Sequence, residues 1–182
     1  MVSLQITTGT TAHTTELIQL YRRVARSTVD GIIREVEEVD KAYVEGFVCA
    51  ATQQGLILEA TDSDQIVGEI HAYTPSILAF RHLLTELTIV VDPDQQGQGI
   101  GSLLLRNFLD RVEANTPYIL RVELYTREHN TRNVRFYEGP GFVNEGHQRH
   151  KILLPDGQVH TPLHMTWFNP SFLFAGDQAP NY

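Results

Sequence analysis

The chain has 182 residues, of which 42% are hydrophobic and 20% charged. This length and composition predict a single globular domain with its own core. Its 14 basic and 22 acidic residues give a formal charge of −8, which argues against a nucleic-acid partner because binding to phosphates requires a basic surface.

The single cysteine, Cys49, cannot form an internal disulfide, which is typical of a reducing compartment. Its apolar neighbours in the segment 47–51 predict a small core residue rather than a nucleophile. Residues 1–13 show no secretory signal, and no apolar run approaches the roughly 18 residues of a membrane span. We therefore expect a cytoplasmic protein with no membrane partner.

The first half of the chain predicts an alternation of helices and strands. Residues 27–38 are polar and irregular, which is typical of a loop between helices. The period of the apolar residues predicts, in chain order, a strand at 4–7, a helix at 15–26, a second helix between Asp40 and Gly55, and strands at 56–60 and 66–73.

The second half predicts strands at 86–91 and 119–126, a helix at about 97–114, a short helix that Asn130 caps and that ends at Gly139, and strands over 142–154 and 161–168. The resulting order, βααβββαβαββ, predicts an α/β (α+β) domain over residues 1–169, with a mixed, mostly antiparallel sheet flanked by helices. Residues 170–182 form a tail without period. Its cluster Phe172–Phe174 fits either docking on this domain or contact with a second subunit in a homodimer.

A glycine-rich loop, Gln96-Gly97-Gln98-Gly99-Ile100-Gly101, lies between a predicted strand and a predicted helix. Glycines let backbone N–H groups approach an anion, and the helix N-terminus adds partial positive charge. A pyrophosphate fits such a loop, and a plain tight turn is the alternative. The dinucleotide pattern fails because Ser102 stands where its third glycine is needed, and no ATP or GTP loop pattern occurs.

The residues Gln96, Gly99 and Gly101 give the pattern Q-x-x-G-x-G. This resembles the coenzyme A pyrophosphate loop of the GNAT superfamily of N-acetyltransferases. Thirty-four residues after Gln96, Asn130 opens a segment similar to the family's N-x-x-A-x-x-F/Y-Y-x-x-x-G-F, with Tyr137 at the offset of its second aromatic residue.

Two positions depart from the family pattern. Asn133 stands where alanine is usual, and Pro140 stands where an apolar residue commonly precedes the glycine. Neither change removes an expected catalytic group, although Asn133 bears on contacts along the cofactor arm.

The resemblance implies a splayed central strand pair and the direct transfer of an acetyl group from acetyl-CoA to a primary amine, with no metal. The cofactor arm would lie between the strands 86–91 and 119–126, and a backbone N–H of the first strand would polarise the thioester carbonyl. The residues implied in cofactor binding are Ile89, Val90, Val91, Gln96, Gly97, Gln98, Gly99, Ile100, Gly101, Ser102, Asn130 and Asn133.

The same resemblance makes Tyr137 the general acid for the leaving thiolate, since a phenol with a pKa near ~10 is protonated at neutral pH. Packing on the core is its alternative role. The attacking amine must first lose a proton. Glu86 is the first candidate for the base and Glu123 the second, although either residue could be a solvated strand residue and bulk water could suffice.

Four histidines flank the late hairpin. His147 and His150, three apart on a strand, point to opposite faces. His160 and His164 could share a face, but no cysteine joins them and their spacing matches no zinc site. We expect no metal, and the resemblance favours a histidine of this region lining the amine pocket.

The acceptor is not specified by the sequence. Acidic residues of the loop 27–38 could guide a cationic amine, although such a run is more often a solvated face: Asp30, Glu35, Glu37 and Glu38. A small-molecule amine is the leading expectation and a peptide or protein amine the variant. A non-catalytic acyl-CoA sensor and a structural interaction protein are the alternatives of another class.

Overall fold

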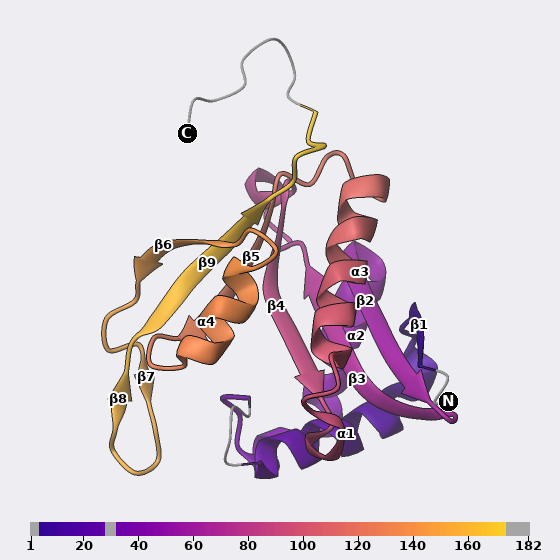
Figure 1. Ribbon diagram of the computed structural model, residues 1–182, viewed down its shortest axis with the longest axis vertical. Helices are drawn as coiled ribbons and strands as arrows, with labels where there is room; N and C mark the ends of the chain where they lie inside the picture. Colours follow the sequence, from indigo (N-terminus) through magenta and orange to yellow (C-terminus); the bar gives the residue numbers. More distant parts are fainter. Residues whose placement is uncertain (1–3, 28–31, 174–182) are drawn as a thin grey trace.

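The computed structural model describes residues 4–27 and 32–173. Its centre is a seven-stranded sheet with the strand order β1-β2-β3-β4-β5-β9-β6 (Figure 1). Neighbouring strands are antiparallel except for β4 and β5, which are parallel. The predicted α/β domain with a mixed, mostly antiparallel sheet is therefore confirmed.

The element order follows the predicted one. The strands of the main sheet are β1 (Gln5–Thr8), β2 (Gly55–Asp62), β3 (Gln65–Tyr73), β4 (Leu83–Val91), β5 (Arg121–Arg127), β6 (Val143–His147) and β9 (Pro162–Phe168). The α-helices are α1 (Thr14–Arg26), α2 (Lys41–Gln54), α3 (Ile100–Asn115) and α4 (Thr131–Glu138), and short 3-10 helices are η1 (Thr11–His13), η2 (Val36–Glu38), η3 (Leu78–Phe80) and η4 (Pro93–Gln95).

The predicted continuous strand over 142–154 is wrong. It is divided into β6 and β7 (Ile152–Leu153), and β7 pairs with β8 (Val159–His160) in a separate two-stranded ribbon. The chain leaves the main sheet after His147, which still faces Leu163 of β9. His150 has a φ of 56°, a left-handed conformation that no extended strand contains.

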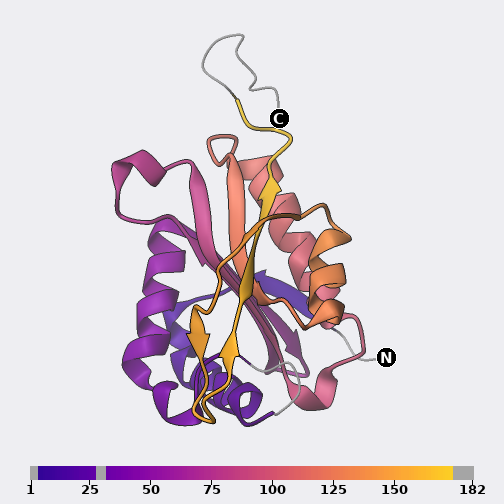
Figure 2. The same cartoon turned by 90° about the vertical axis from the view of Figure 1, so that its left-hand side faces the viewer.

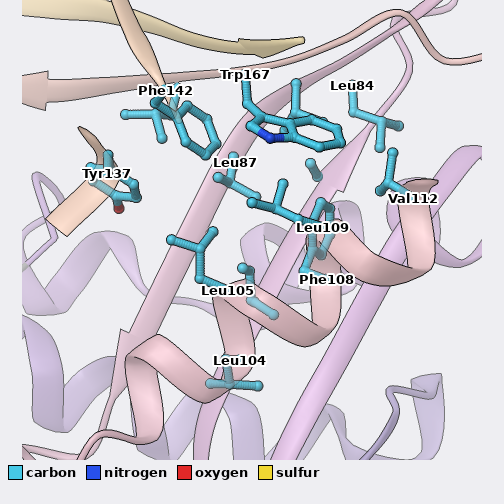
Figure 3. Close-up of a cluster of buried hydrophobic side chains, with 14 of the residues drawn as sticks. Leu84, Leu87, Leu104, Leu105, Phe108, Leu109, Val112, Tyr137, Phe142 and Trp167 are labelled. Carbon is cyan, nitrogen blue, oxygen red and sulfur yellow. The ribbon is translucent and has the colours of Figure 1, made fainter. Parts of the chain in front are cut away.

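Helices cover both faces of the sheet: α1 and α2 on one side, α3 and α4 on the other (Figure 2). The core under α3 and α4 includes Phe108 and Trp167 (Figure 3). The core under α1 and α2 includes Tyr21 and Phe47. Cys49 is exposed rather than buried as predicted, because the inward face of α2 is formed by other residues at helical spacing, namely Val44, Phe47, Val48 and Ala51.

The strands β4 and β5 pair only at one end, which confirms the splayed central pair. Their register covers Leu83↔Arg121 and Leu84↔Val122, and the strands then diverge, as Figure 1 shows. On its other side β4 carries a bulge, because its register with β3 shifts between Thr85 and Thr88. Glu86 lies in this bulge with a φ of 58°.

Beyond β9, the N–H of Leu173 donates to the carbonyl oxygen of Pro117 at 3.1 Å. The rest of the tail, with Phe174, lies outside the described residues. The boundary at 169/170 and the homodimer therefore stay predictions. Among the helices of the described segments, none has the length and apolar character that crossing a bilayer requires.

Candidate active site

A cavity of about 810 Å³ opens where β4 and β5 diverge. It is bounded by β3, β4, the glycine loop, α4, α2 and the segment before η2. It brings together almost all of the residues that the sequence singles out: Glu86, Ile89, Val90, Val91, Gln96, Gly97, Gly99, Ile100, Gly101, Ser102, Asn130, Asn133 and Tyr137. Of the residues implied in cofactor binding, Gln98 alone does not line it, and its amide donates to Gln95 Oε1 at 2.9 Å instead.

The glycine loop is anchored at its start by Asp92. This buried carboxylate accepts hydrogen bonds from Arg23 Nε of α1 at 2.8 Å and from the backbone N–H of Asp94 at 3.1 Å. Further along the loop, Gly97 and Gly99 have φ values of 78° and 83°. Residues that carry a Cβ rarely adopt this left-handed backbone conformation, so the loop needs glycine at both positions.

The loop places the N-terminus of α3, which has no side-chain cap, at the cavity. Gly99 is the N-cap of α3 and offers no side-chain cap. The first intrahelical bond runs from the N–H of Leu103 to the carbonyl oxygen of Gly99 at 3.0 Å. The N–H groups of residues 100–102 therefore have no partner within the helix, and together with the helix dipole they form a site suited to an anion.

The edge of β4 that faces β5 adds backbone polar groups. The N–H of Asp92 donates to Val67 of β3 at 2.8 Å, and Val90 is in register with Glu69 of the same strand. Because successive residues of a strand direct their polar groups to opposite sides, those of Ile89 and Val91 face the gap. Val90 contributes its side chain to the cavity wall, while its backbone groups face β3.

The helix α4 is fixed by its own cap. Asn130 Oδ1 accepts the N–H of Asn133 at 3.0 Å, so the predicted cap is confirmed. On the inner face of α4, Tyr137 is only 8% exposed. Its ring packs edge-on against Phe136 and Phe142, with centroid distances of 5.0 and 5.7 Å.

Tyr137 belongs both to the core and to the cavity lining. In Figure 3 its hydroxyl oxygen points away from Phe142 and Trp167. Burial raises the pKa of the Tyr137 phenol well above its usual range. The phenol therefore keeps its proton over the whole neutral and mildly alkaline range.

The two candidate bases lie in different places. Glu86 is exposed and lines the cavity. Glu123 does not line it: its carboxylate pairs with Arg121 Nε at 2.6 Å, in a cluster with Glu145 and His164 on the face of β5 and β9. Of the two, only Glu86 lies at the cavity.

The part of the cavity next to α2 and β3 is mostly aromatic. Tyr43 and Phe47 of α2 and Tyr73 of β3 line it, and the Arg34 guanidinium lies 3.9 Å from the centroid of the Tyr43 ring. Of the acidic loop residues, Glu38 reaches the cavity lining. Asp30 lies outside the described residues.

The histidines of the late hairpin do not line this cavity, contrary to the prediction. They have other partners: His147 contacts Glu128 at 3.2 Å, the His160 ring packs against His129 at 4.6 Å, and His164 stacks on Tyr125 at 4.9 Å. Within residues 4–27 and 32–173, no three His, Cys, Asp or Glu side chains gather as a metal site would require.

The histidine that does line the cavity is His71 of β3. It belongs to a buried cluster with Glu69 and Tyr21 that sequence reasoning missed. The available signal was the alternation Glu69-x-His71-x-Tyr73, which places these side chains on one face of the strand. The sequence does not show that α1 and α2 cover that face.

A diverging strand pair, a glycine loop that leads into an uncapped helix and a cavity between them define an acyl-CoA-dependent transferase. The family model of the acetyltransferase (GNAT) domain matches residues 46–144, and the chain belongs to this family. The chain is accordingly an acetyl-CoA-dependent N-acetyltransferase.

Solved structures support the same fold. The chain is similar to yncA of Salmonella typhimurium, solved with its cofactor acetyl-CoA, at 17% identity and a TM-score of 0.79, with 98% of each chain covered. It is similar to a phosphinothricin acetyltransferase of Sinorhizobium meliloti in complex with AcCoA, at 17% identity and 0.79, covering 93% of this chain and 90% of that one. It is also similar to the ribosomal-protein-S18-alanine N-acetyltransferase of Escherichia coli, at 20% identity and 0.72, covering 98% and 99%. No curated protein matches the chain by sequence.

Proposed function

We propose that the enzyme transfers the acetyl group of acetyl-CoA to the primary amine of a small molecule, with Tyr137 as the general acid. The observation that carries this proposal is the single cavity of about 810 Å³ that the glycine loop, the free edge of β4 and Tyr137 share. Acetyl-CoA would occupy the part of this cavity at the glycine loop and β4, which leaves the part at α2 and β3 for the acceptor.

The cofactor would be held by the chain's backbone. The free N–H groups of residues 100–102 and the left-handed glycines suit the pyrophosphate. The gap-facing groups of Ile89 and Val91 suit the amides of the pantetheine arm, and one of their N–H groups suits the thioester oxygen as it gains negative charge. Asn130 and Asn133 would border the arm from the start of α4.

Transfer requires several proton movements. The ammonium form of the acceptor first loses one proton to a base. The amine nitrogen then attacks the thioester carbon, the carbon–sulfur bond breaks, and the sulfur takes a proton from the Tyr137 hydroxyl. The nitrogen releases its second proton as the amide forms, and a proton from solvent restores the phenol. Among the residues that the sequence singles out, Glu86 is the base that lies in the cavity. A phenol suits the acid role because it carries its proton at neutral pH.

A peptide or protein amine is the second candidate acceptor. One of the similar structures is, by its name, an N-acetyltransferase of a ribosomal protein. The aromatic side chains of Tyr43, Phe47 and Tyr73 line the part of the cavity at α2 and β3, and such a lining suits a compact, partly apolar molecule, which favours the small amine.

The proposal is tested in two stages. Calorimetric titration with acetyl-CoA should show one saturable site, with NADH and ATP as non-binding controls. A panel of small aromatic and aliphatic amines, polyamines, amino acids and peptides is then screened for release of the CoA thiol. Turnover of small amines above that of the peptides supports the proposal. Selective turnover of peptides contradicts the small-molecule acceptor, and binding without any turnover supports the sensor.

A further inference from the structure

His71 is held by a buried chain of hydrogen bonds. Tyr21 of α1 donates from its hydroxyl to Glu69 Oε2 at 2.5 Å, and Glu69 Oε1 lies 3.0 Å from His71 Nδ1. Glu69 is fully buried and His71 is 2% exposed. A buried carboxylate is costly unless its oxygens are bonded, so this chain fixes both the position of the carboxylate and the rotation of the imidazole.

The arrangement leaves one ring nitrogen for the cavity. With Nδ1 facing Glu69, the proton of a neutral imidazole belongs on Nδ1, and Nε2 carries the lone pair. Nε2 has no hydrogen-bond partner among the described residues, while His71 lines the cavity. The Phe47 ring is stacked on the imidazole at 4.1 Å and an interplanar angle of 5°, which limits its movement further.

His71 also lies beside the proposed reaction centre. It is in register with Thr88 of β4, directly before Ile89, whose backbone groups face the gap. Glu86 lines the same cavity but is exposed and has no such support. An oriented imidazole at this position is better placed than a solvated carboxylate to take a proton from an amine next to the thioester.

We infer that His71, oriented by Glu69 and Tyr21, is the general base that deprotonates the acceptor amine, in place of Glu86. The inference rests on the proposed function. An ammonium N–H gives its proton to His71 Nε2, and the nitrogen lone pair then forms the bond to the thioester carbon. The imidazolium is stabilised by the Glu69 carboxylate until it returns the proton to solvent. Glu86 is left to attract the cation.

Several titratable or charged groups contact the imidazole or contact its neighbours. They are Tyr21 of α1, Tyr43 of α2, Glu59 of β2, Glu69 and Tyr73 of β3, Glu86 of β4, and Arg34 before η2. The main variant below therefore changes His71 itself, and Glu86→Gln is compared with it as the competing base.

The chain provides a matched control. His13 Nδ1 lies 2.6 Å from Glu59, a buried glutamate directly opposite Glu69 across β2 and β3. This second histidine–glutamate pair has the same chemistry, but His13 and Glu59 do not line the cavity. His13→Gln therefore reports what the loss of such a pair does to the fold alone.

The test compares wild type, His71→Gln, Glu86→Gln and His13→Gln, with 2-phenylethylamine or the best acceptor of the panel. We expect His71→Gln to lower kcat/KM by about 10²–10³-fold at pH 7, with unchanged affinity for acetyl-CoA. The deficit should shrink toward pH 10, where the amine loses its proton without help. His13→Gln should show no such pH-dependent deficit. A deficit equal at all pH values, or one confined to Glu86→Gln, would overturn the inference.

The tautomer gives a second readout that needs no acceptor. Nitrogen-15 NMR at pH 8 should show His71 protonated at Nδ1 and bare at Nε2. A proton on Nε2 rules the base role out, whatever the kinetics. Wild-type protein that binds acetyl-CoA and acetylates no amine contradicts the proposed function itself, whereas normal turnover by His71→Gln contradicts the inference alone.

Discussion

Tyr137 lies where the hydrophobic core meets the cavity. This position explains how its ring can pack in the core while its hydroxyl acts in the cavity. Its ring contacts Phe136 and Phe142, so its orientation is set by core packing. Its hydroxyl lies at the edge of that packing, pointing away from Phe142 (Figure 3). A proton donor supported in this way needs no rearrangement at the moment of reaction.

Replacement of Tyr137 by phenylalanine should therefore separate chemistry from folding. We expect Tyr137→Phe to lower kcat by about 10²-fold and to leave the Kd for acetyl-CoA and the free energy of unfolding nearly unchanged. Tyr125→Phe is the control, because Tyr125 also lines the cavity but from β5. Equal kcat values for the two variants would remove Tyr137 from the acid role.

The sequence was informative about residues whose role is local. Asn130 was predicted as a cap because a side-chain oxygen before a helix accepts a nearby N–H, and the Asn133 N–H confirms it. It was not informative about residues defined by long-range packing. Cys49 is exposed and His71 is buried, and both depend on which helix face meets which sheet face.

The loop between β4 and α3 requires glycine at residue 99 because of its backbone conformation, not because a side chain would clash there. A Cβ at Gly99 would meet no atom within 4 Å, and the same holds for Gly46 in α2. The two sites differ in φ, since only Gly99 is left-handed, at 83°. They form a natural pair for measuring the cost of that conformation.

Gly99→Ala should destabilise the fold by about 1–2 kcal/mol, the cost of a left-handed residue that carries a Cβ. It should also weaken acetyl-CoA binding at least tenfold, because a loop that relaxes would turn the N–H groups of residues 100–102 away from the pyrophosphate. Gly46→Ala should stabilise the fold by about 0.5–1 kcal/mol and leave binding unchanged. Urea unfolding and calorimetry measure both effects. Unaltered binding by Gly99→Ala would show that the loop does not hold the cofactor.

Helices were easier to predict than the late strands. Asp40 and Gly55 bound α2 as expected, and Asp40 Oδ1 accepts the N–H of Tyr43 at 2.8 Å. The division of 142–154 into β6 and β7 leaves no such mark, because residues 144–151 are polar or glycine throughout and carry no period that would show where the backbone turns. The splay of β4 from β5 likewise has no periodic signal, and it was expected only from the family resemblance.

At the scale of the whole molecule, buried phenols link stability to alkaline pH. Burial is the largest cause that raises the pKa of Tyr21, Tyr43, Tyr73 and Tyr137. A raised pKa means that the folded state holds its protons more tightly than the unfolded chain, whose phenols titrate at 10.0. This stabilisation is complete below pH 10 and is lost as the pH rises above it.

We therefore expect the free energy of unfolding to fall between pH 10 and 12, by up to about 1.4 kcal/mol per pH unit for each such tyrosine. Urea unfolding at pH 8, 10 and 11 measures the slope. Tyr137→Phe should make it shallower, whereas Tyr118→Phe, at an exposed position, should not. An identical slope in both variants would mean that Tyr137 is not linked to alkaline unfolding.

The divergence of β4 from β5 gives the sheet an edge in its interior. Unpaired strand edges usually invite a strand of another chain and lead to aggregation. Here the geometry prevents such pairing. The two strands are hydrogen-bonded only where they begin, at residues 83–84 and 121–122, so the gap between them is a wedge that is closed at one end. A foreign strand has no way to run through it, whereas a slender molecule with amides along its length can enter from the open end. Backbone N–H and C=O groups that would favour aggregation at the outer edge of the sheet therefore favour, inside the sheet, the binding of a narrow ligand that fits the wedge.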